Sequence, residues 1–386
     1  MRILFVHQNF PGQYVHIVQQ LAGLGNHQLV ALGINALDRS RPLPDSLHYL
    51  RYRLQRGNTK GIHPLVMETE TKLIRAEACV KGAERLKAKG FKPDLICAHP
   101  GWGEALFLKA IWPSSPLLCY QEFFYNDQGY DSNFDPEFPV KNTSEFCKLR
   151  LKNINNYMNF EVADLGISPP SWQASTFPDS FRSKISVIHD GIDTNLLKPD
   201  PSATYKLNNN LILKTNDEII TFVNRNLEPC RGFHIFMRAL PQILKSRPNV
   251  KVIIVGGSNT GYGPKSINFN SWKECFFSEI EGSLSTSELD RIHFVGTLNY
   301  SDFISVLQLS TVHVYLTYPF VLSWSLLEAM SLGCSIVASK TGPVVEFIEH
   351  EKSGVLVDFF DHDGLANEVL NLLGNDKKRE KTSKGY

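Results

Sequence analysis

The second half of the sequence alternates short runs of apolar, often β-branched residues with segments of helical length. The runs that predict strands are Ile219–Val223, Val250–Val255, Ile292–Val295, Val312–Leu316, Ser335–Ala338 and Gly354–Val357. The segments that predict helices are Phe233–Lys245, Asp302–Leu309, Trp324–Leu332, Val344–Glu349 and Leu365–Leu373. Strands that are apolar throughout are buried on both faces, so the alternation predicts a doubly wound α/β domain built on a parallel sheet.

The first half repeats this pattern less regularly. Its predicted strands are Ile3–His7, Gln28–Leu32, Leu95–Ala98, Leu117–Gln121, Leu165–Ile167 and Ile185–Ile188. Long helical stretches are predicted from about Pro64 to Lys89 and from about Ser144 to Val162. A linker is predicted near 190–217, where Pro199, Pro201 and the run Asn208-Asn209-Asn210 lie. Because 386 residues exceed the usual size of one hydrophobic core, we expect two such domains, with a ligand cleft beyond the carboxyl ends of the strands.

Charge and cysteine content narrow the class of protein. Forty Lys+Arg residues against 39 Asp+Glu give a net charge of +1, which argues against nucleic acid as the main partner. Seven cysteines without a C-x-x-C pair are typical of reduced thiols in the cytoplasm. No apolar run reaches the roughly 20 residues that span a bilayer. The basic stretch Lys148, Arg150 and Lys152 leaves a peripheral contact with the inner face of a membrane open, although a solvated helix face explains it more simply.

Several strong catalytic signatures do not occur in the sequence. It contains no G-x-x-x-x-G-K-[ST], H-E-x-x-H or G-x-S-x-G motif, and no G-x-G-x-x-G after a predicted strand. A P-loop kinase, a zinc protease, an α/β-hydrolase and a standard NAD dehydrogenase are therefore disfavoured.

The segment from Tyr318 to Ser339 is the most informative one. A predicted strand ends at Leu316, a loop carries Ser323 and Ser325, and a helix then runs to Gly333. The N–H groups at the start of a helix attract anions such as a diphosphate. Glu328 lies one turn into this helix, where its oxygens could bind a vicinal diol such as a ribose. A solvated helix residue is the alternative for an isolated glutamate.

Six short pieces, in this order along the chain, carry a resemblance to a known family. They are Asn9-Phe10-Pro11-Gly12, Cys97-Ala98-His99-Pro100, Ile188-His189-Asp190-Gly191-Ile192-Asp193, Asn224-Arg225-Asn226-Leu227-Glu228-Pro229-Cys230-Arg231-Gly232, Ile254-Val255-Gly256-Gly257 and Leu326-Leu327-Glu328-Ala329. With them the sequence resembles retaining glycosyltransferase family 4, the group 1 glycosyltransferases of the GT-B fold, and in particular members that act in exopolysaccharide biosynthesis.

The resemblance implies a GT-B fold, in which two Rossmann-like domains with doubly wound parallel sheets face a deep cleft. Residues 1–190 would bind the acceptor and residues 191–386 the nucleotide-sugar donor. The implied reaction moves a sugar from a nucleoside-diphosphate sugar, UDP rather than GDP, to an acceptor hydroxyl with retained configuration. The acceptor would be a saccharide, a lipid-linked compound or a small molecule, in polysaccharide or glycoconjugate biosynthesis.

No cofactor is implied, and because no Asp-x-Asp motif is placed for a divalent metal, metal independence is expected. Two alternatives stay open, a sugar-nucleotide epimerase of the same fold and a non-catalytic nucleotide-sugar-binding protein.

The family's functional residues map onto eleven positions. The implied catalytic residues are His99, which faces the sugar, and Arg225 and Arg231, which contact the donor diphosphate. The implied donor-binding residues are Gly12, Gly256, Leu298, Ser323, Trp324, Ser325, Leu326 and Glu328. Arg231 lies where the family usually has lysine, which changes a point donor into a fork. The acceptor side is less clear: a groove could be lined by Glu104, Gln121, Glu122, Phe123, Phe124 and Tyr125, although an aromatic cluster is more often core.

Two positions depart from the family pattern. The family usually has two glutamates separated by seven residues, and the first contacts hydroxyls of the transferred sugar. Counting back from Glu328 places Phe320 at the position of that first glutamate. A phenyl ring accepts no hydrogen bond from a hydroxyl, so recognition of the donor sugar must differ here. The family also continues into a helix that crosses back onto the first domain, whereas residues 375–386 form a charged tail that we expect to be unfolded.

Overall fold

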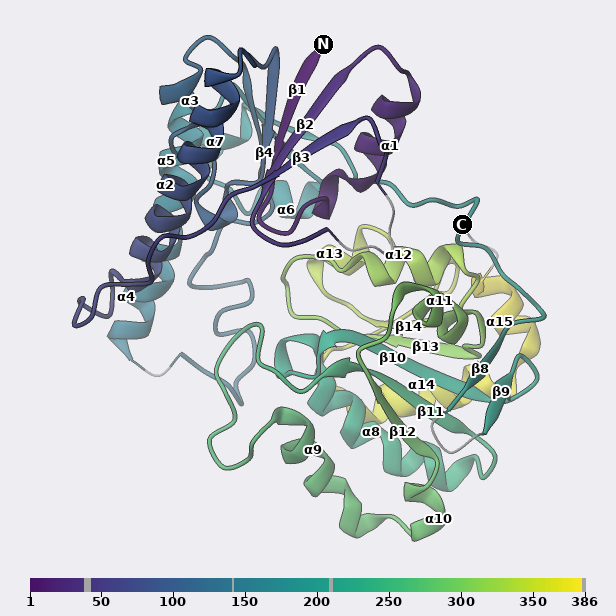
Figure 1. Cartoon of the computed structure of the whole chain (residues 1–386). Helices are drawn as coiled ribbons and strands as arrows, with labels where there is room; N and C mark the ends of the chain where they lie inside the picture. Colours follow the sequence, from purple (N-terminus) through teal and green to yellow (C-terminus); the bar gives the residue numbers. More distant parts are fainter. Residues whose placement is uncertain (38–42, 141, 208–210, 384–386) are drawn as a thin grey trace. The chain divides into compact units, whose positions relative to one another are not determined.

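The computed structural model describes residues 1–37, 43–140, 142–207 and 211–383 of the chain (Figure 1). The chain divides into two compact units, Met1–Gly191 and Ile192–Tyr386, and each contains a parallel sheet. The asparagine run at 208–210 and the last three residues of the predicted tail lie outside the described residues. Two α/β units with parallel sheets confirm the predicted fold class.

The first unit is built on a seven-stranded parallel sheet with the order β3-β2-β1-β4-β5-β6-β7. Its strands are β1 (Arg2–Val6), β2 (Gln28–Gly33), β3 (Leu47–Arg51), β4 (Leu95–Ala98), β5 (Leu117–Tyr120), β6 (Leu165–Ser168) and β7 (Ile185–Val187). Its helices are α1 (Val15–Gly23), α2 (Met67–Ala88), α3 (Leu108–Ile111), α4 (Thr143–Lys152), α5 (Ile154–Val162), α6 (Ser171–Ser175) and α7 (Asp179–Arg182), with 3₁₀ turns η1 (Gly12–Tyr14) and η2 (Pro100–Trp102).

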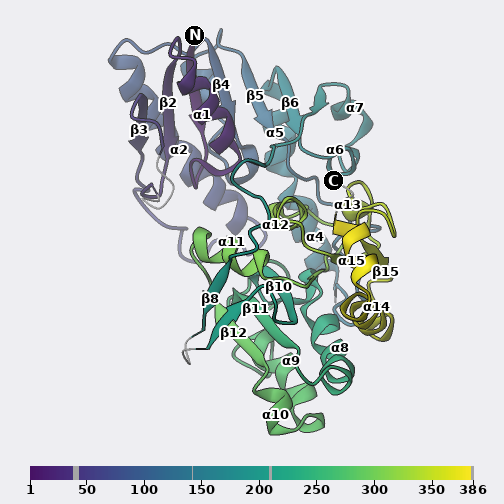
Figure 2. The same cartoon turned by 90° about the vertical axis from the view of Figure 1, so that its right-hand side faces the viewer.

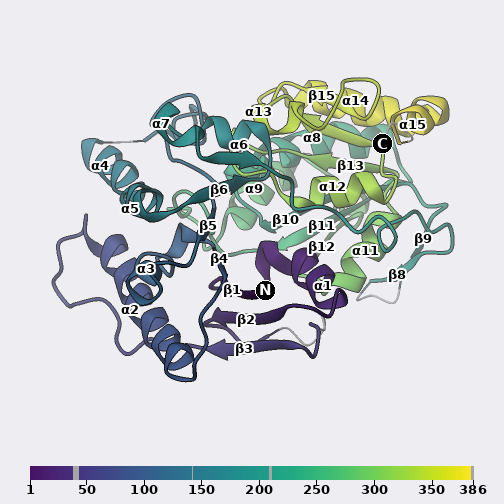
Figure 3. The same ribbon diagram turned by 90° about the horizontal axis from the view of Figure 1, so that it is seen from above.

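Alternate residues of the β1 strand enter two different cores. Phe5 packs with Val18 of α1 on one face of the sheet, and Leu4 packs with Cys79 of α2 on the other. Figure 3 shows α1 on one side of these strands and α2 with α3 on the other. A strand covered on both faces carries no polar side, which explains the unbroken apolar run in β1.

The second unit has a six-stranded parallel sheet with the order β12-β11-β10-β13-β14-β15 and a separate antiparallel hairpin, β8-β9. Its strands are β8 (Thr204–Lys206), β9 (Ile212–Lys214), β10 (Ile219–Asn226), β11 (Lys251–Gly257), β12 (Ile292–Gly296), β13 (Val312–Tyr315), β14 (Ile336–Ser339) and β15 (Val355–Val357). Its helices are α8 (Phe233–Ser246), α9 (Trp272–Ile280), α10 (Thr286–Leu289), α11 (Tyr300–Gln308), α12 (Trp324–Ser331), α13 (Gly342–Val345), α14 (His362–Gly374) and α15 (Asp376–Ser383), with 3₁₀ turns η3 (Pro229–Arg231) and η4 (Glu281–Ser283).

Helices cover both faces of this second sheet. Leu326 of α12 and Val306 of α11 pack with Val223 and Ile253 on one face. On the other face Phe236 of α8 stacks on Phe222 of β10, with ring centroids 4.5 Å apart. Figures 1 and 2 show α8 and α14 together on the side of the sheet opposite α11. Within the described part of the chain, no helix is both long and apolar enough to cross a membrane.

In both units the strand order reverses at the first strand. The chain proceeds outward from β1 through β2 to β3 and then returns to β4 on the other side of β1; β10 and β13 have the same relation. Loops that follow the two strands flanking such a reversal diverge to opposite faces, and the space between them is where doubly wound sheets bind ligands. The loops after β1 and β4, and after β10 and β13, are therefore the places to look for a site.

The predicted helical stretch 144–162 is helical, divided at Asn153 into α4 and α5. Two other predictions about individual elements were wrong. The linker near 190–217 contains the β8-β9 hairpin. The charged tail forms the helix α15 from 376 to 383, where Arg379 donates to the carbonyl oxygens of Leu372 and Leu373 at the end of α14.

Candidate functional site

The cationic centre of the second unit lies where the loops after β10 and β13 meet. Arg231 ends the turn η3, and only 8% of it is exposed. Its Nη1 donates to the hydroxyl of Thr317 (2.9 Å) and to the carbonyl oxygen of Val321 (3.0 Å), both in the loop after β13. Gly232 follows with φ +68°, and a side chain there would overlap Leu316. This glycine lets the chain turn directly from η3 into α8, which fixes Arg231 beside the β13 loop.

Two aromatic rings lie against Arg231. The Phe320 ring centroid is 5.5 Å from Cζ of Arg231 and the Tyr262 centroid is 5.7 Å from it, and these two rings contact each other edge-on at 4.9 Å. Both rings lie within cation–π range of the guanidinium. Phe320 is 3% exposed, so the residue found where the family has its first glutamate packs onto the arginine.

Glu228 is a buried carboxylate near the two predicted arginines, and the sequence analysis assigned it no role of its own. It accepts the backbone N–H groups of Gly261 (3.1 Å) and Tyr262 (2.9 Å). Burial raises the pKa of its carboxyl, while those N–H groups and the charges of Arg231 and Arg225 act in the opposite direction. Arg225, at the end of β10, is exposed. Glu228 thus holds the loop that carries Tyr262, and its position in the sequence between Arg225 and Arg231 was the signal for it.

The start of α12 is organised by serine side chains. Ser323 caps the helix: its hydroxyl oxygen accepts the N–H of Ser325 (3.3 Å) and the Ser325 hydroxyl (2.9 Å), and its own N–H donates to the Tyr315 hydroxyl (2.9 Å). Trp324 is partly exposed, whereas the Leu326 side chain is fully buried in the core. The side chain of Leu326 therefore supports the fold, and only its backbone is suited to meet a ligand.

Glu328 faces α11 from the first turns of α12. It is 8% exposed, and the Tyr300 hydroxyl donates to its Oε1 at 2.8 Å. Leu298, two residues ahead of Tyr300, packs with Tyr300 against the core cluster that contains Leu326. The structure thus brings together Glu328, Leu298 and Leu326, three of the predicted donor-binding residues.

The two predicted glycines are required by packing. At Gly256 a Cβ atom would lie 2.9 Å from the carbonyl oxygen of Asn224, so no side chain fits at the end of β11. Gly12 has φ +51°, and a side chain there would overlap the ring of His7. Close packing accounts for both glycines without a ligand.

His99 follows β4 in the first unit and is 3% exposed. Its Nδ1 accepts the N–H of Gly101 (3.1 Å), its ring stacks on Trp102 with centroids 4.2 Å apart, and its Nε2 lies 3.6 Å from Oε2 of Glu122. The ring of His7, at the end of β1, contacts it edge-on at 5.3 Å. The structure thus surrounds His99 with aromatic rings and one carboxylate, and sequence reasoning had missed His7 and Trp102.

Asparagines of α5 and its N-cap hold the loops that carry His99 and Glu122. Asn155 donates to the carbonyl oxygen of Pro100, and Asn156 donates to that of Phe123 (3.1 Å). Asn153 accepts the N–H of Tyr125 (3.0 Å) and donates to its carbonyl oxygen (2.6 Å). These bonds give buried backbone groups the partners they need and fix the path of both loops.

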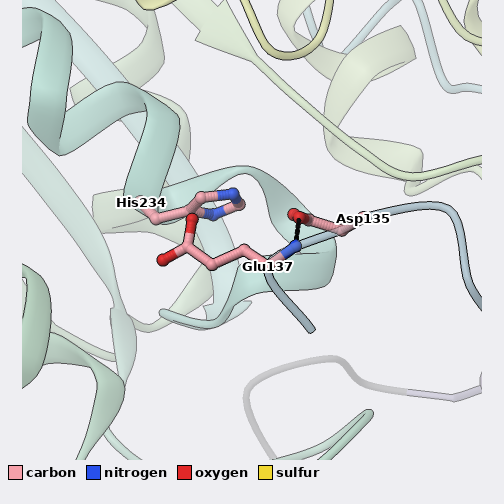
Figure 4. A group of neighbouring side chains, drawn as sticks. All are labelled: Asp135, Glu137 and His234. Atoms are coloured by element: carbon pink, nitrogen blue, oxygen red, sulfur yellow. Dashed lines mark hydrogen bonds between the residues drawn. The ribbon is translucent and has the colours of Figure 1, made fainter. Parts of the chain in front are cut away.

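The long segment between β5 and α4 contains a turn closed by an acidic side chain. Asp135 is buried and its Oδ1 accepts the backbone N–H of Glu137 at 2.9 Å, the bond drawn in Figure 4. The carbonyl oxygen of Asp135 also accepts the N–H of Phe138 (3.1 Å). Asp135 therefore has a local structural role in this loop.

The comparisons with known proteins define the class. Residues 25–197 match the family model described as "Glycosyl transferase family 4 group", and residues 206–385 match "Glycosyl transferases group 1". The chain belongs to the group 1 glycosyltransferases of family 4, and its two doubly wound units have the GT-B fold.

Three individual proteins illustrate the likeness. The chain is 25% identical over 336 residues to spore coat protein SA of Bacillus subtilis (strain 168), which covers 85% of this chain and 80% of that protein. It is 25% identical over 197 residues to D-inositol 3-phosphate glycosyltransferase of Segniliparus rotundus, covering 49% of this chain and 39% of that protein. The crystal structure of HepE of Anabaena in complex with UDP and glucose superposes with a TM-score of 0.68 at 19% identity, over 100% of this chain and 93% of that one.

Proposed function

We propose that this protein transfers a sugar from a nucleoside-diphosphate sugar to an acceptor hydroxyl and retains the anomeric configuration. The main support, beside the family, is the arrangement at the ends of β10 and β13. There Arg231 is fixed by Thr317 and Val321, and Glu328 is oriented by Tyr300 in the first turns of a serine-capped helix. A cation, a helix start and a carboxylate are the groups that a diphosphate and a ribose require.

The reaction needs a stabiliser for the leaving group more than a protein nucleophile. The bond between the anomeric carbon and the diphosphate oxygen breaks, the acceptor oxygen bonds to that carbon, and the acceptor proton passes to the leaving phosphate oxygen on the same face. Negative charge grows on the diphosphate, and Arg231 and Arg225 would stabilise it. Loss of one preorganised donor of this kind raises a barrier by about 3–4 kcal/mol.

We propose UDP as the nucleotide and a saccharide or a lipid-linked or small-molecule hydroxyl as the acceptor, in polysaccharide or glycoconjugate synthesis. HepE was crystallised with UDP and with UDP-glucose, which supports UDP as the first nucleotide to test. Residues of the second unit would bind the donor and residues of the first unit the acceptor. Neither a cofactor nor a metal ion is part of the proposed chemistry.

Thermal unfolding with a panel of nucleoside diphosphates tests the donor assignment directly. A ligand present at 100 times its dissociation constant stabilises the folded state by about 2.7 kcal/mol. We expect UDP to raise the melting temperature more than GDP, ADP or CDP. A larger shift with GDP would replace the nucleotide assignment, and no shift with any of the four would overturn the proposed function.

Product analysis separates the transferase from its alternatives. UDP-glucose incubated with the protein and without an acceptor should stay intact or hydrolyse slowly to glucose and UDP in NMR spectra. A new epimer of the nucleotide sugar would instead identify an epimerase. Binding of UDP-glucose without turnover, in the presence of a panel of saccharide acceptors, would identify a non-catalytic binding protein.

A further inference from the structure

A chain of hydrogen bonds connects His7 to the carboxylate of Glu122 at the strand ends of the first unit, beside His99. Nδ1 of His7 accepts the N–H of Asn9 (3.0 Å), and its Nε2 bonds to Oε1 of Gln13 (2.7 Å). The amide nitrogen of Gln13 then donates to Oε1 of Glu122 (3.0 Å). This chain ties residues that follow β1 to a residue that follows β5, and it orients the carboxylate of Glu122.

The acceptor role of each Nδ1 fixes where the ring protons lie. Because Nδ1 of His7 accepts a backbone N–H, its proton is on Nε2, and Gln13 receives it at the amide oxygen. Burial and the neighbouring His99 lower the pKa of His7 to about 3, so this ring stays neutral. Nδ1 of His99 likewise accepts the N–H of Gly101, and its Nε2 carries the proton that faces Glu122.

Glu122 is the acceptor that faces this proton. Burial opposes its ionisation, but the His99 and His7 rings and the Gln13 amide lower the pKa of its carboxyl below the usual value. Its Oε2 lies 3.6 Å from Nε2 of His99. A closed charge-assisted hydrogen bond would measure about 2.7–2.9 Å. A donor and an acceptor therefore face each other across a gap that they do not close themselves.

The two groups differ in their access to solvent. The side chain of Glu122 is 31% exposed, whereas that of His99 is 3% exposed and its Nε2 has no hydrogen-bond partner among the described residues. A buried N–H group without a hydrogen-bond partner costs free energy. Binding of a ligand atom that accepts a hydrogen bond from Nε2 of His99 is therefore favoured. An oxygen atom about 2.8 Å from both groups would satisfy them together.

We infer that His99 and Glu122 together bind one hydroxyl of a sugar, which accepts from Nε2 of His99 and donates to Oε2 of Glu122. A hydroxyl offers one donor and an acceptor on the same atom, which matches the pair; a phosphate oxygen would be repelled by the carboxylate. His7 and Gln13 are positioning residues that act through the orientation of Glu122. The inference rests on the proposed function, because a sugar substrate supplies the hydroxyl.

The hydroxyl belongs either to the transferred sugar or to the acceptor, and titration calorimetry distinguishes the two. The titrations are UDP alone, UDP-glucose alone, and glucose into protein saturated with UDP. For Glu122→Gln, which points an amide N–H at the N–H of His99, we expect UDP affinity within twofold of wild type. A tenfold or greater loss for UDP-glucose assigns the hydroxyl to the transferred sugar, and the same loss for glucose assigns it to the acceptor.

Two further variants control the experiment. Glu161→Gln makes the same chemical change at an exposed position of α5 and should leave all three affinities unchanged. Glu122→Asp keeps the charge but shortens the side chain, and it should show the same selective loss if Glu122→Gln does not fold. Unchanged affinities in folded Glu122 variants, or an equal loss for all three ligands, would overturn the inference while the proposed function stands. A wild-type protein that binds neither UDP nor UDP-glucose would reject both.

Discussion

Glu328 and Tyr300 form a pair in which one residue orients the other. The Tyr300 hydroxyl donates to Oε1, and a carboxylate has about four lone-pair sites, so Glu328 can accept further hydrogen bonds from a ribose in this orientation. For Glu328→Ala we expect UDP affinity to fall at least tenfold, since hydrogen bonds to charged groups contribute about 1.5–3 kcal/mol each. Tyr300→Phe should weaken UDP binding by about three- to tenfold, because it removes the hydrogen bond that orients the carboxylate while Glu328 itself remains. Titration calorimetry with UDP measures the affinity of both variants. An unchanged UDP affinity of folded Glu328→Ala would show that Glu328 is not part of the donor site.

Arg231 has a geometry that a lysine reproduces only in part. Its Nη1 donates to both Thr317 and Val321, and its Cζ lies over the rings of Phe320 and Tyr262. We expect Arg231→Ala to lower the rate of UDP-glucose turnover by about 100- to 1000-fold. Arg231→Lys should recover part of this loss, because lysine keeps the positive charge but lacks the planar guanidinium with its several N–H donors.

The matched control for Arg231 is Arg238 in the following helix α8, which pairs with Glu279 (2.8 Å). Arg238→Ala should leave turnover within twofold of wild type. Equal rates for folded Arg231→Ala and Arg238→Ala would show that Arg231 is not part of the donor site.

Strand β13 carries a histidine in the core of the second unit. His313 is fully buried, Thr221 bonds to its Nδ1 (2.8 Å), and burial lowers its pKa from 6.5 to about 3. Between pH 6.5 and pH 3 the unfolded chain therefore binds a proton at this residue that the folded chain does not. The stability from neutral His313 is fully present above pH 6.5 and is lost as the pH falls below it.

The expected loss between pH 7.5 and pH 5.5 is about 1.4 kcal/mol of unfolding free energy from this histidine. Urea titrations at the two pH values measure it. His313→Gln should reduce the pH dependence by this amount, whereas His48→Gln, at an exposed position of β3, should not change it. The same pH dependence in wild type and His313→Gln would contradict the lowered pKa.

Elements with a strong local signal could be predicted, and those that depend on distant partners could not. The apolar runs of β10 and β11 and the amphipathic pattern of α8 can each be recognised from the local sequence alone. Strand β3, Leu47–Arg51, has only half-buried and exposed residues and gave no such signal. The Asn153 side chain bonds to the backbone of Tyr125, 28 residues away, and the helix α15 is held at the end of α14 by Arg379.

In the candidate sites, too, residues within short motifs could be predicted, whereas contacts between residues far apart in the sequence could not. His99, Arg231 and Glu328 could be named because short motifs surround them. Gln13 and Glu122 are 109 positions apart, and only the strand order, in which β4 alone separates β1 from β5, brings their loops together. Phe320 was recognised as a departure from the family pattern, but its contact with Arg231 required the fold of the β13 loop.

Metal independence is a prediction for the whole protein. Asp361-His362-Asp363 has the spacing of an Asp-x-Asp motif, but Asp361 caps α14 by accepting the N–H of Gly364 (2.7 Å). We expect the turnover of UDP-glucose in EDTA to equal that in magnesium within twofold. Activity that disappears in EDTA and returns with magnesium would contradict this.

The asparagines of α5 and its N-cap contact main-chain atoms of the neighbouring loops. Every residue type carries the backbone carbonyl oxygen to which Asn155 and Asn156 donate. Every type except proline also carries the backbone N–H that Asn153 accepts. Side chains in these loops can therefore be exchanged without loss of the bonds that determine the path of the loops. Substrate preference can diverge among descendants of such a protein while its framework is inherited unchanged.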